Sequence, residues 1–182
     1  KLWECLDLLV TKYQIKSLQT LMGDSVASLM AADPEKLWKC LDLLVTKYKI
    51  KSLHTFVRNG VASLMATDPE KLWECLDLLV TKYKIKSLQT FVRNGVASLM
   101  AADPEKLWEC LDILVTKYQI KSLQTFMSDS VASLMATDPD KLWSLLDEFG
   151  QSLIKPMCNG VAKKLKNATW VNHLRTLNSM VD

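Results

Sequence analysis

One motif of 35 residues recurs along most of this chain, and its period limits what the chain can fold into. The copy from Lys36 to Glu70 reads KLWKCLDLLVTKYKIKSLHTFVRNGVASLMATDPE. The same period separates five tryptophans and four Asp-Pro pairs, which lie at Trp3, Trp38, Trp73, Trp108 and Trp143 and at Asp33, Asp68, Asp103 and Asp138. Periods of roughly 20–50 residues are typical of solenoids, in which each unit buries its apolar face against its neighbours. The sequence therefore predicts a stacked array of repeats.

The composition favours an all-α fold. Helix-forming residues dominate, only 5 glycines and 5 prolines occur among 182 residues, and no segment alternates apolar and polar residues as strands do. The apolar runs are far shorter than the roughly 20 residues that span a membrane, so we expect no membrane partner. The chain begins at Lys1 in the middle of a repeat, and we therefore expect a fragment of a longer protein.

Each repeat is expected to hold two helices, A and B. Asp68, Pro69 and Glu70 form a helix start, because Asp caps free amides, Pro suits the first turn and Glu suits the positive end. In the second copy we place helix A at about 34–48 and helix B at about 50–66. The expected apolar arc of helix B consists of Ile50, Leu53, Phe56, Val57, Val61, Leu64 and Met65.

A break inside helix B is the alternative to a continuous helix. Asn59-Gly60 is a turn signal, so a kink, or a third helix from Val61 to Thr67, also fits the sequence. In copies one and four, Asp24-Ser25 and Asp129-Ser130 stand at this place and suit the cap of a new short helix. The unbroken apolar arc favours continuity.

These elements predict a superhelical α-solenoid of 35-residue helical hairpins. Four tandem repeats are expected at 1–35, 36–70, 71–105 and 106–140. The segment 141–182 is interpreted as a degenerate repeat with a C-terminal capping helix, since its Asn-Gly-Val-Ala sequence returns after 30 residues instead of 35. A terminal repeat needs a polar outer face, which Lys163, Lys164 and Lys166 supply.

No arrangement of residues typical of catalysis, metal binding or cofactor binding is found. The two histidines, His54 and His173, stand in different contexts. No nucleophile–base pair, metal-ligand spacing or phosphate-binding glycine loop accompanies them. We therefore expect no enzymatic activity, no cofactor and no small-molecule substrate.

Four of the five cysteines occupy the same place in successive repeats, at Cys5, Cys40, Cys75 and Cys110. Corresponding residues of a stacked array lie about one helix-packing distance apart, roughly 8–10 Å, whereas a disulfide needs Cα atoms within about 7 Å. We expect these cysteines to be small buried apolar residues. The compartment is not readable from the sequence, although reduced cysteines favour an intracellular one.

The copies fall into two types that differ at two places. Copies two and three carry Lys after the tyrosine and Arg-Asn-Gly in helix B, whereas copies one and four carry Gln and an acidic segment. Copies two and three have net charges of +3 and +1, and copies one and four have −2 each. A basic ridge with fixed spacing suits phosphate contacts along DNA or RNA. The residues predicted to bind nucleic acid are Lys16, Lys49, Lys51, Arg58, Asn59, Lys84, Lys86, Arg93, Asn94 and Lys121.

Two other interpretations remain open. Charged helix faces are usually just solvated, so drift between two duplicated unit types explains the charge pattern equally well. Leu43 also lies alone on the polar side of helix A, as do its counterparts Leu8, Leu78 and Ile113. If helix B of the next layer leaves them uncovered, they form an apolar ridge that suits a protein partner. The chain is then a protein-interaction scaffold without a nucleic-acid role.

The repeats are similar to those of the mitochondrial transcription termination factor family. The shared pattern covers residues 1–140 and appears as Glu70, Leu72, Leu76, Leu79, Val80, Leu88, Phe91, Val92, Arg93, Leu99 and Met100. This resemblance implies a curved superhelix of helical hairpins or triplets with a basic groove for duplex DNA or RNA. The family carries Pro before the closing pair, where this repeat has Ala97 or Ser98. The variable pair Asn94-Gly95 also resembles that of transcription-activator-like effectors, which have nearly identical two-helix repeats.

Overall fold

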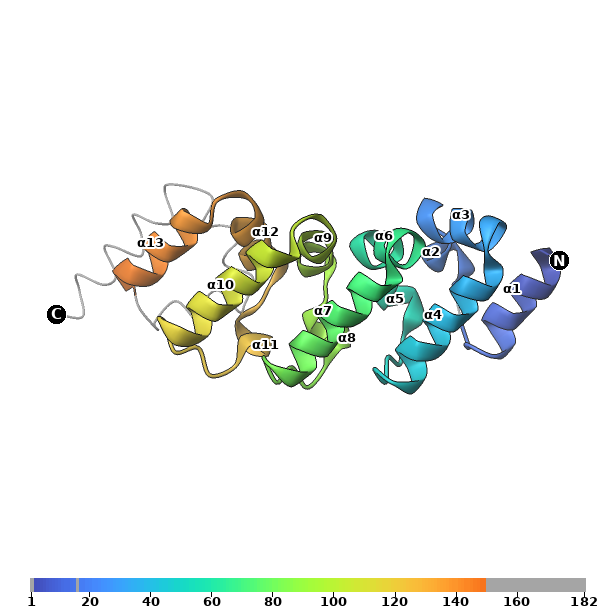
Figure 1. Cartoon of the computed structure of the whole chain (residues 1–182), viewed down its shortest axis with the longest axis horizontal. Coiled ribbons are helices and arrows are strands. Elements are labelled where there is room, and N and C mark those ends of the chain that lie inside the picture. Colours follow the sequence, from blue (N-terminus) through green and yellow to red (C-terminus); the bar gives the residue numbers. More distant parts are fainter. Residues whose placement is uncertain (1, 16, 150–182) are drawn as a thin grey trace. The chain divides into compact units, whose positions relative to one another are not determined.

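The computed structural model describes residues 2–15 and 17–149. Every regular element in these ranges is an α-helix, which confirms the predicted all-α class (Figure 1). The chain divides into two compact units, Lys1–Pro104 and Glu105–Asp182. The first unit contains α1 (Leu2–Thr11), α2 (Leu18–Leu21), α3 (Asp24–Ala32), α4 (Pro34–Thr46), α5 (Leu53–Phe56), α6 (Asn59–Thr67), α7 (Pro69–Thr81), α8 (Leu88–Phe91) and α9 (Asn94–Ala102). The second unit contains α10 (Pro104–Thr116), α11 (Leu123–Phe126), α12 (Asp129–Thr137) and α13 (Pro139–Phe149).

A long, a very short and a medium helix follow one another in each repeat. The long helices α4, α7 and α10 begin at prolines that are 35 residues apart, Pro34, Pro69 and Pro104. Within the first unit, α3 packs on α6 and α6 on α9, while the short helix α2 packs on α5. Figure 1 shows α4 and α7 running in the same direction in this unit. The chain is thus a helical-repeat protein whose unit contains three helices.

The long helix of each repeat begins as predicted and ends slightly early. The Asp33 carboxylate accepts a hydrogen bond from the Lys36 amide at 2.9 Å, and Pro34 occupies the first turn. Helix α4 ends at Thr46, about two residues before the predicted end. Its buried stripe is fully shielded from solvent at Leu37, Leu41 and Leu44. Capping and periodicity therefore determine this helix locally.

The expected continuous helix B is wrong, and the third-helix alternative is correct. Helix α5 begins at Leu53, after an extended segment, and ends at Phe56. The Arg58 amide then donates to the Phe56 carbonyl at 2.9 Å, which closes a tight turn before α6 begins at Asn59. All residues of the predicted apolar arc are nevertheless buried. The apolar arc therefore predicted correctly which residues are buried. These residues lie in two separate helices and in the loops beside them, and not in one continuous helix.

Gly60 allows close packing between α6 and α9. A Cβ atom at this position would overlap the Ala97 carbonyl of α9, so only glycine allows α6 to approach α9 this closely. The glycine of the variable segment Arg58-Asn59-Gly60 therefore serves the packing between repeats, and the nucleic-acid contact of Asn59 stays a prediction.

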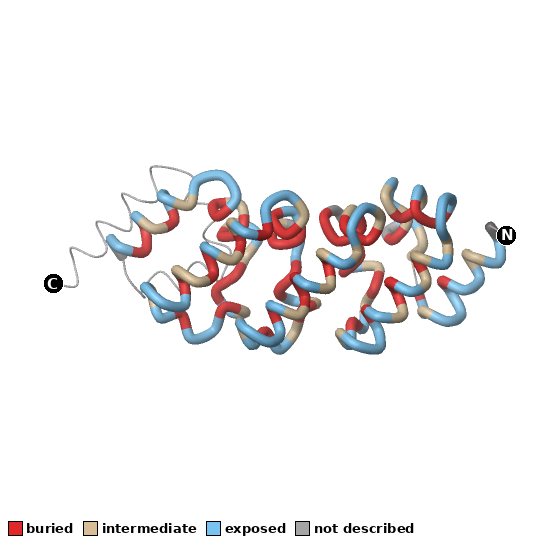
Figure 2. Tube along the Cα trace, in the orientation of Figure 1, coloured by how far each residue is buried: buried red, intermediate tan, exposed pale blue. Residues whose placement is uncertain are grey.

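Each helix of the first unit carries buried residues, which together form its apolar core (Figure 2). Cys40 belongs to this core, as expected, and burial raises the pKa of its thiol to about 11. In the second unit, Leu107, Leu111 and Leu114 of α10 are completely shielded. Of the predicted C-terminal cap, α13 covers residues up to Phe149, and 150–182 lie outside the described residues.

Replacing Gly60 by Ala should lower the free energy of unfolding by about 1–3 kcal/mol, because the new methyl group would overlap backbone rather than a movable side chain. Gly23 is the matched control, since a Cβ there meets nothing within 4 Å. We expect Gly23→Ala to change stability by less than about 1 kcal/mol. Urea denaturation of both variants measures the difference. Equal effects would show that close approach at Gly60 is unimportant.

Candidate nucleic-acid interface

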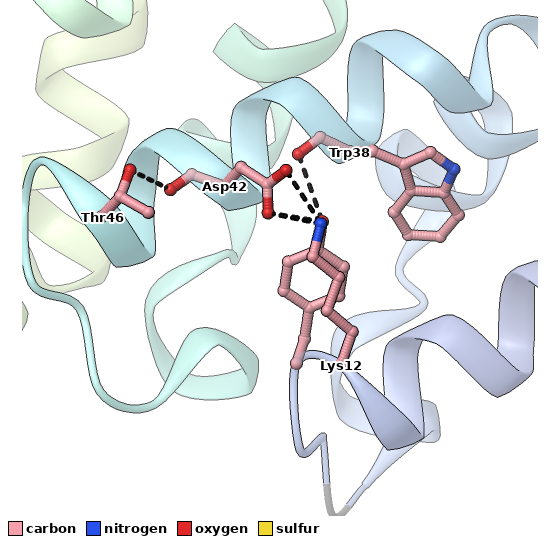
Figure 3. Close-up of polar contacts among 5 residues, drawn as sticks. Lys12, Trp38, Asp42 and Thr46 are labelled. Atoms are coloured by element: carbon pink, nitrogen blue, oxygen red, sulfur yellow. Dashed lines mark hydrogen bonds and ion pairs between the residues drawn. The ribbon is translucent and has the colours of Figure 1, made fainter.

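A tyrosine, a tryptophan, an aspartate and a lysine link the end of α1 to α4 in the first unit (Figure 3). The Tyr13 ring stacks on Trp38 with centroids 5.9 Å apart, and its hydroxyl donates to the Asp42 carboxylate at 2.9 Å. The Lys12 ammonium pairs with the same carboxylate at 2.9 Å. The first unit repeats this arrangement at Tyr48, Trp73, Asp77 and Lys47, and the second unit at Tyr118, Trp143, Asp147 and Lys117. We call this arrangement the inter-repeat clamp.

The clamp changes the proton affinity of its members. The hydrogen bond from Lys12 lowers the pKa of Asp42, and the hydrogen bond to Asp42 raises the pKa of Lys12. Partial burial raises the pKa of Tyr13. The carboxylate therefore stays ionised and paired, so Lys12 is engaged in structure rather than offered to a ligand. The same holds for Lys47 with Asp77.

The residue after each clamp tyrosine has a left-handed backbone. Lys49 has a φ of 56° and Lys84 one of 54°, and Gln14 and Gln119 share the conformation. The Ile50 amide donates to the Leu44 carbonyl at 2.9 Å, which satisfies a free carbonyl at the end of α4. Ile50 is buried, whereas Lys49 is exposed. The first variable position is thus a left-handed residue just beyond the end of the long helix, and its side chain is exposed to solvent.

Two neighbouring clefts in the first unit are lined by this loop. The first has a volume of about 700 Å³ and is lined by Lys12, Tyr13, Gln14, Ile15, Val45, Lys49, Ile50, Lys51, Ser52, Leu53 and His54. The second has a volume of about 570 Å³ and is lined by Lys47, Tyr48, Lys49, Ile50, Lys51, Asp77, Val80, Ile85, Lys86, Ser87, Leu88 and Gln89. The segment from Lys49 to Lys51 lines both and so lies between them.

Three lysines of these clefts are free of acidic partners. Lys49, Lys51 and Lys86 are exposed, and none forms an ion pair with any residue that the structure describes. The single acidic residue lining the clefts, Asp77, is already paired with Lys47. The clefts therefore combine an apolar floor with a net positive rim, which suits an anionic ligand.

The other predicted residues do not join this group. Lys84 is exposed at the end of α7 but does not line either cleft, and Lys121 is exposed in the second unit. Lys16 and the side chains of Asn59 and Asn94 lie outside the described part of the chain.

Lys51, His54 and Arg58 do not lie along one helix. Lys51 precedes α5 and Arg58 follows it, because the helix is only 4 residues long. Arg58 Nε donates to the His54 carbonyl at 2.9 Å, and Arg93 Nε donates to the Thr90 carbonyl at 3.0 Å. Both arginines thus bond the end of a short helix instead of lining the clefts.

Sequence reasoning missed the clamp and the role of Gln89. The signal for the clamp was the invariant Lys-Tyr pair followed by Trp and Asp at fixed distances in each copy. Gln89 bonds the backbone of the preceding repeat, and its signal was a recurring Gln at the place that His54 occupies in copy two.

A further surface of the repeats, which we call the apolar edge, carries the exposed leucines of the long helices. Leu43 and Leu78, which belong to the expected apolar ridge, are each 37% exposed. Leu43 lines a third cleft of about 510 Å³, together with Trp73 and Glu70. Within residues 2–15 and 17–149, no cluster of three or more residues suited to a metal ion occurs, and no helix is long and apolar enough to cross a membrane.

Comparisons of the chain with protein-family models, with curated proteins and with solved structures find no match. They therefore assign it to no family, and the described geometry is the basis for inferring its function.

Replacing Lys49 by Gly should raise the free energy of unfolding by about 0.5–1 kcal/mol, because glycine adopts the left-handed backbone without steric cost. The control is Lys39→Gly, at an exposed position inside α4, which should lower stability by about 1 kcal/mol. Thermal or urea unfolding of both variants tests this. Destabilisation of similar size in both would contradict the role of the left-handed cap.

The clamp should weaken in acid. The pKa of Asp77 is lowered in the folded state, so its stabilising effect is present above the ordinary aspartate value of about 3.9 and is lost as the pH falls through the folded-state value. The Asp77 side chain is 46% exposed, so the effect stays below about 1 kcal/mol. We expect Asp77→Asn to lower stability near pH 6 and to reduce its fall toward about pH 3. Urea unfolding at both pH values measures this, and parallel falls would argue against the pairing.

Proposed function

We propose that this chain is part of an α-solenoid of 35-residue repeats that binds nucleic acid through its phosphate backbone. The observation that carries the proposal is the group of three exposed lysines, Lys49, Lys51 and Lys86, without acidic partners in two adjacent clefts. Lys49 and Lys51 come from one repeat, and Lys86 holds the place of Lys51 in the next. A solenoid presents such side chains at regular intervals, as a polymer of phosphates requires.

The lysines differ in whether they are paired with an aspartate, and this difference supports a phosphate ligand. Lys12 and Lys47 are paired with aspartates in the clamp, whereas the lysines that follow the clamp tyrosines are left in solvent. Binding a phosphate releases its condensed counterions, so an unpaired ammonium group gains more than one that must first leave a carboxylate. The proposed contacts therefore involve Lys49, Lys51 and Lys86, with Lys84 as a peripheral contact.

The sequence resemblance to mitochondrial transcription termination factor repeats agrees with this proposal. That resemblance implies hairpins or triplets of helices, and the repeats described above contain three helices. It rests on the sequence pattern alone, since the comparisons find no matching family. The proposal is for a binding protein, with no catalytic role.

A protein-interaction scaffold is the second candidate function. Leu43 and Leu78 are partly exposed on successive long helices, and Val45 and Val80 line the two basic clefts. Phosphate contacts make no use of such apolar groups, whereas protein interfaces do. A protein partner would therefore bind over the apolar edge, with little dependence on salt.

Gel-shift titrations with a short DNA duplex, single-stranded DNA and RNA test the proposed function. We expect binding at low ionic strength that weakens steeply as salt increases. The double variant Lys51→Glu with Lys86→Glu should lose at least about tenfold in affinity, and its slope of log affinity against log salt should be smaller by about 2.

The matched control is Leu43→Asp with Leu78→Asp, which also adds negative charge to exposed positions but on the apolar edge. This control should bind nucleic acid almost as the wild type does. Absence of binding by the wild type at low salt, or a salt slope near zero, would overturn the proposal. Salt-insensitive capture of a protein that is lost in the leucine variant would favour the scaffold.

A further inference from the structure

Gln89 crosses from one repeat to the basic loop of the preceding repeat. Its side-chain Oε1 accepts hydrogen bonds from the backbone amides of Lys51, at 3.1 Å, and Ser52, at 3.3 Å. Its Nε2 donates to Thr55 Oγ1 at 3.3 Å. Gln89 lies on α8, whereas Lys51 and Ser52 belong to the loop that leads into α5 and Thr55 lies on α5 itself. One amide group therefore makes two contacts with the loop that separates the two basic clefts and one with the short helix that follows it.

These contacts satisfy amides that the fold leaves without helical partners. Lys51 and Ser52 lie between the end of α4 and the start of α5, where no carbonyl of a preceding turn is available. Ser52 precedes the first residue of α5, and its side chain does not cap the helix. Without Gln89, these two amides would have to find water, and the loop would lose its attachment to the next repeat.

The attachment also limits the freedom of the basic side chains. Ile50 is buried and Lys49 is held in a left-handed conformation, so the loop is already anchored on its N-terminal side. Gln89 anchors the C-terminal side through Lys51 and Ser52. With both sides held, the Lys49 and Lys51 side chains start from a fixed backbone between the clefts.

We propose that Gln89 is a positioning residue that orders the loop from Lys49 to Ser52 for phosphate binding. This inference rests on the proposed nucleic-acid function and adds to it a contribution from the next repeat. A binding loop that is already ordered loses less conformational entropy when the ligand binds, so the affinity is higher. Gln89 lines the second cleft but carries no charge, so its removal should lower affinity without changing the number of ionic contacts.

The chain provides a matched control at the same place in its first repeat. Gln19 lies on α2 at the position that Gln89 takes on α8, 70 residues later. Gln19 is exposed, and its side chain has no hydrogen-bond partner among the residues that the structure describes. Gln19→Met and Gln89→Met therefore make the same chemical change, and only the second removes contacts to a basic loop.

The test combines amide hydrogen exchange with binding of the short DNA duplex. In Gln89→Met, exchange at the Lys51 and Ser52 amides should accelerate at least about tenfold, while core amides of α4 and α7 keep their protection. Affinity for the duplex should fall roughly 2- to 10-fold, with an unchanged salt slope. In Gln19→Met, both measurements should match the wild type. Lys51→Gln should instead reduce the salt slope by about 1.

A second variant at the same position, Gln89→Glu, separates the ordering of the loop from the effect of charge on binding. Gln89→Glu keeps an oxygen acceptor for the two amides but places a negative charge beside Lys51, so loop protection should persist while duplex affinity falls. If Gln89→Met behaves like Gln19→Met in exchange and affinity, the positioning role is wrong. If the wild type binds no nucleic acid, the proposed function fails and the binding role of Gln89 fails with it. The exchange measurement then still decides whether Gln89 orders the loop.

Discussion

Within each compact unit, a tyrosine that reaches across the boundary between two repeats joins one long helix to the next. Tyr48 stacks on Trp73 and donates its hydroxyl to Asp77, and Lys47 pairs with the same carboxylate. The aromatic rings supply apolar contact area, while the carboxylate accepts two charge-assisted or polar bonds with a defined direction. The clamp therefore fixes the position of α7 relative to the end of α4. Because Tyr48 is part of the clamp, the loop that follows it begins at a fixed place.

The clamp also explains why lysines that are close in sequence differ in availability. Lys47 is bound to Asp77, whereas Lys49, only two residues later, follows a reversal of backbone direction and is exposed. The next residue, Ile50, is buried in the core, and the residue after it, Lys51, is again exposed. Exposed and buried residues thus alternate from Lys49 to Lys51, so two unpaired lysines follow closely after the ion pair of Lys47 with Asp77. Attachment of the loop through Gln89 belongs to the same arrangement, since it comes from the repeat that the clamp has positioned.

The two differences between unit types acquire separate physical meanings. Exchange of Gln for Lys at the left-handed position changes the charge of an exposed cap without altering its backbone, since all four copies share the conformation. Exchange at the second position concerns packing, because Gly60 admits the carbonyl of Ala97 at a distance that a side chain would block. Arg58 meanwhile bonds the end of α5. The two differences change together in sequence, but only the first alters the basic clefts.

The sequence by itself determined the 35-residue period, the start of each long helix and the identity of the core residues. Caps such as Asp33 and stripes such as Leu37, Leu41 and Leu44 act within one helix, so local patterns reveal them. Only the tertiary structure decided that helix B breaks and which lysines remain free. An apolar arc reports which residues are buried, but not whether the chain between them is continuous. The partners of Lys47 and Gln89 lie about one repeat away, at a position that exists only once the repeats have stacked.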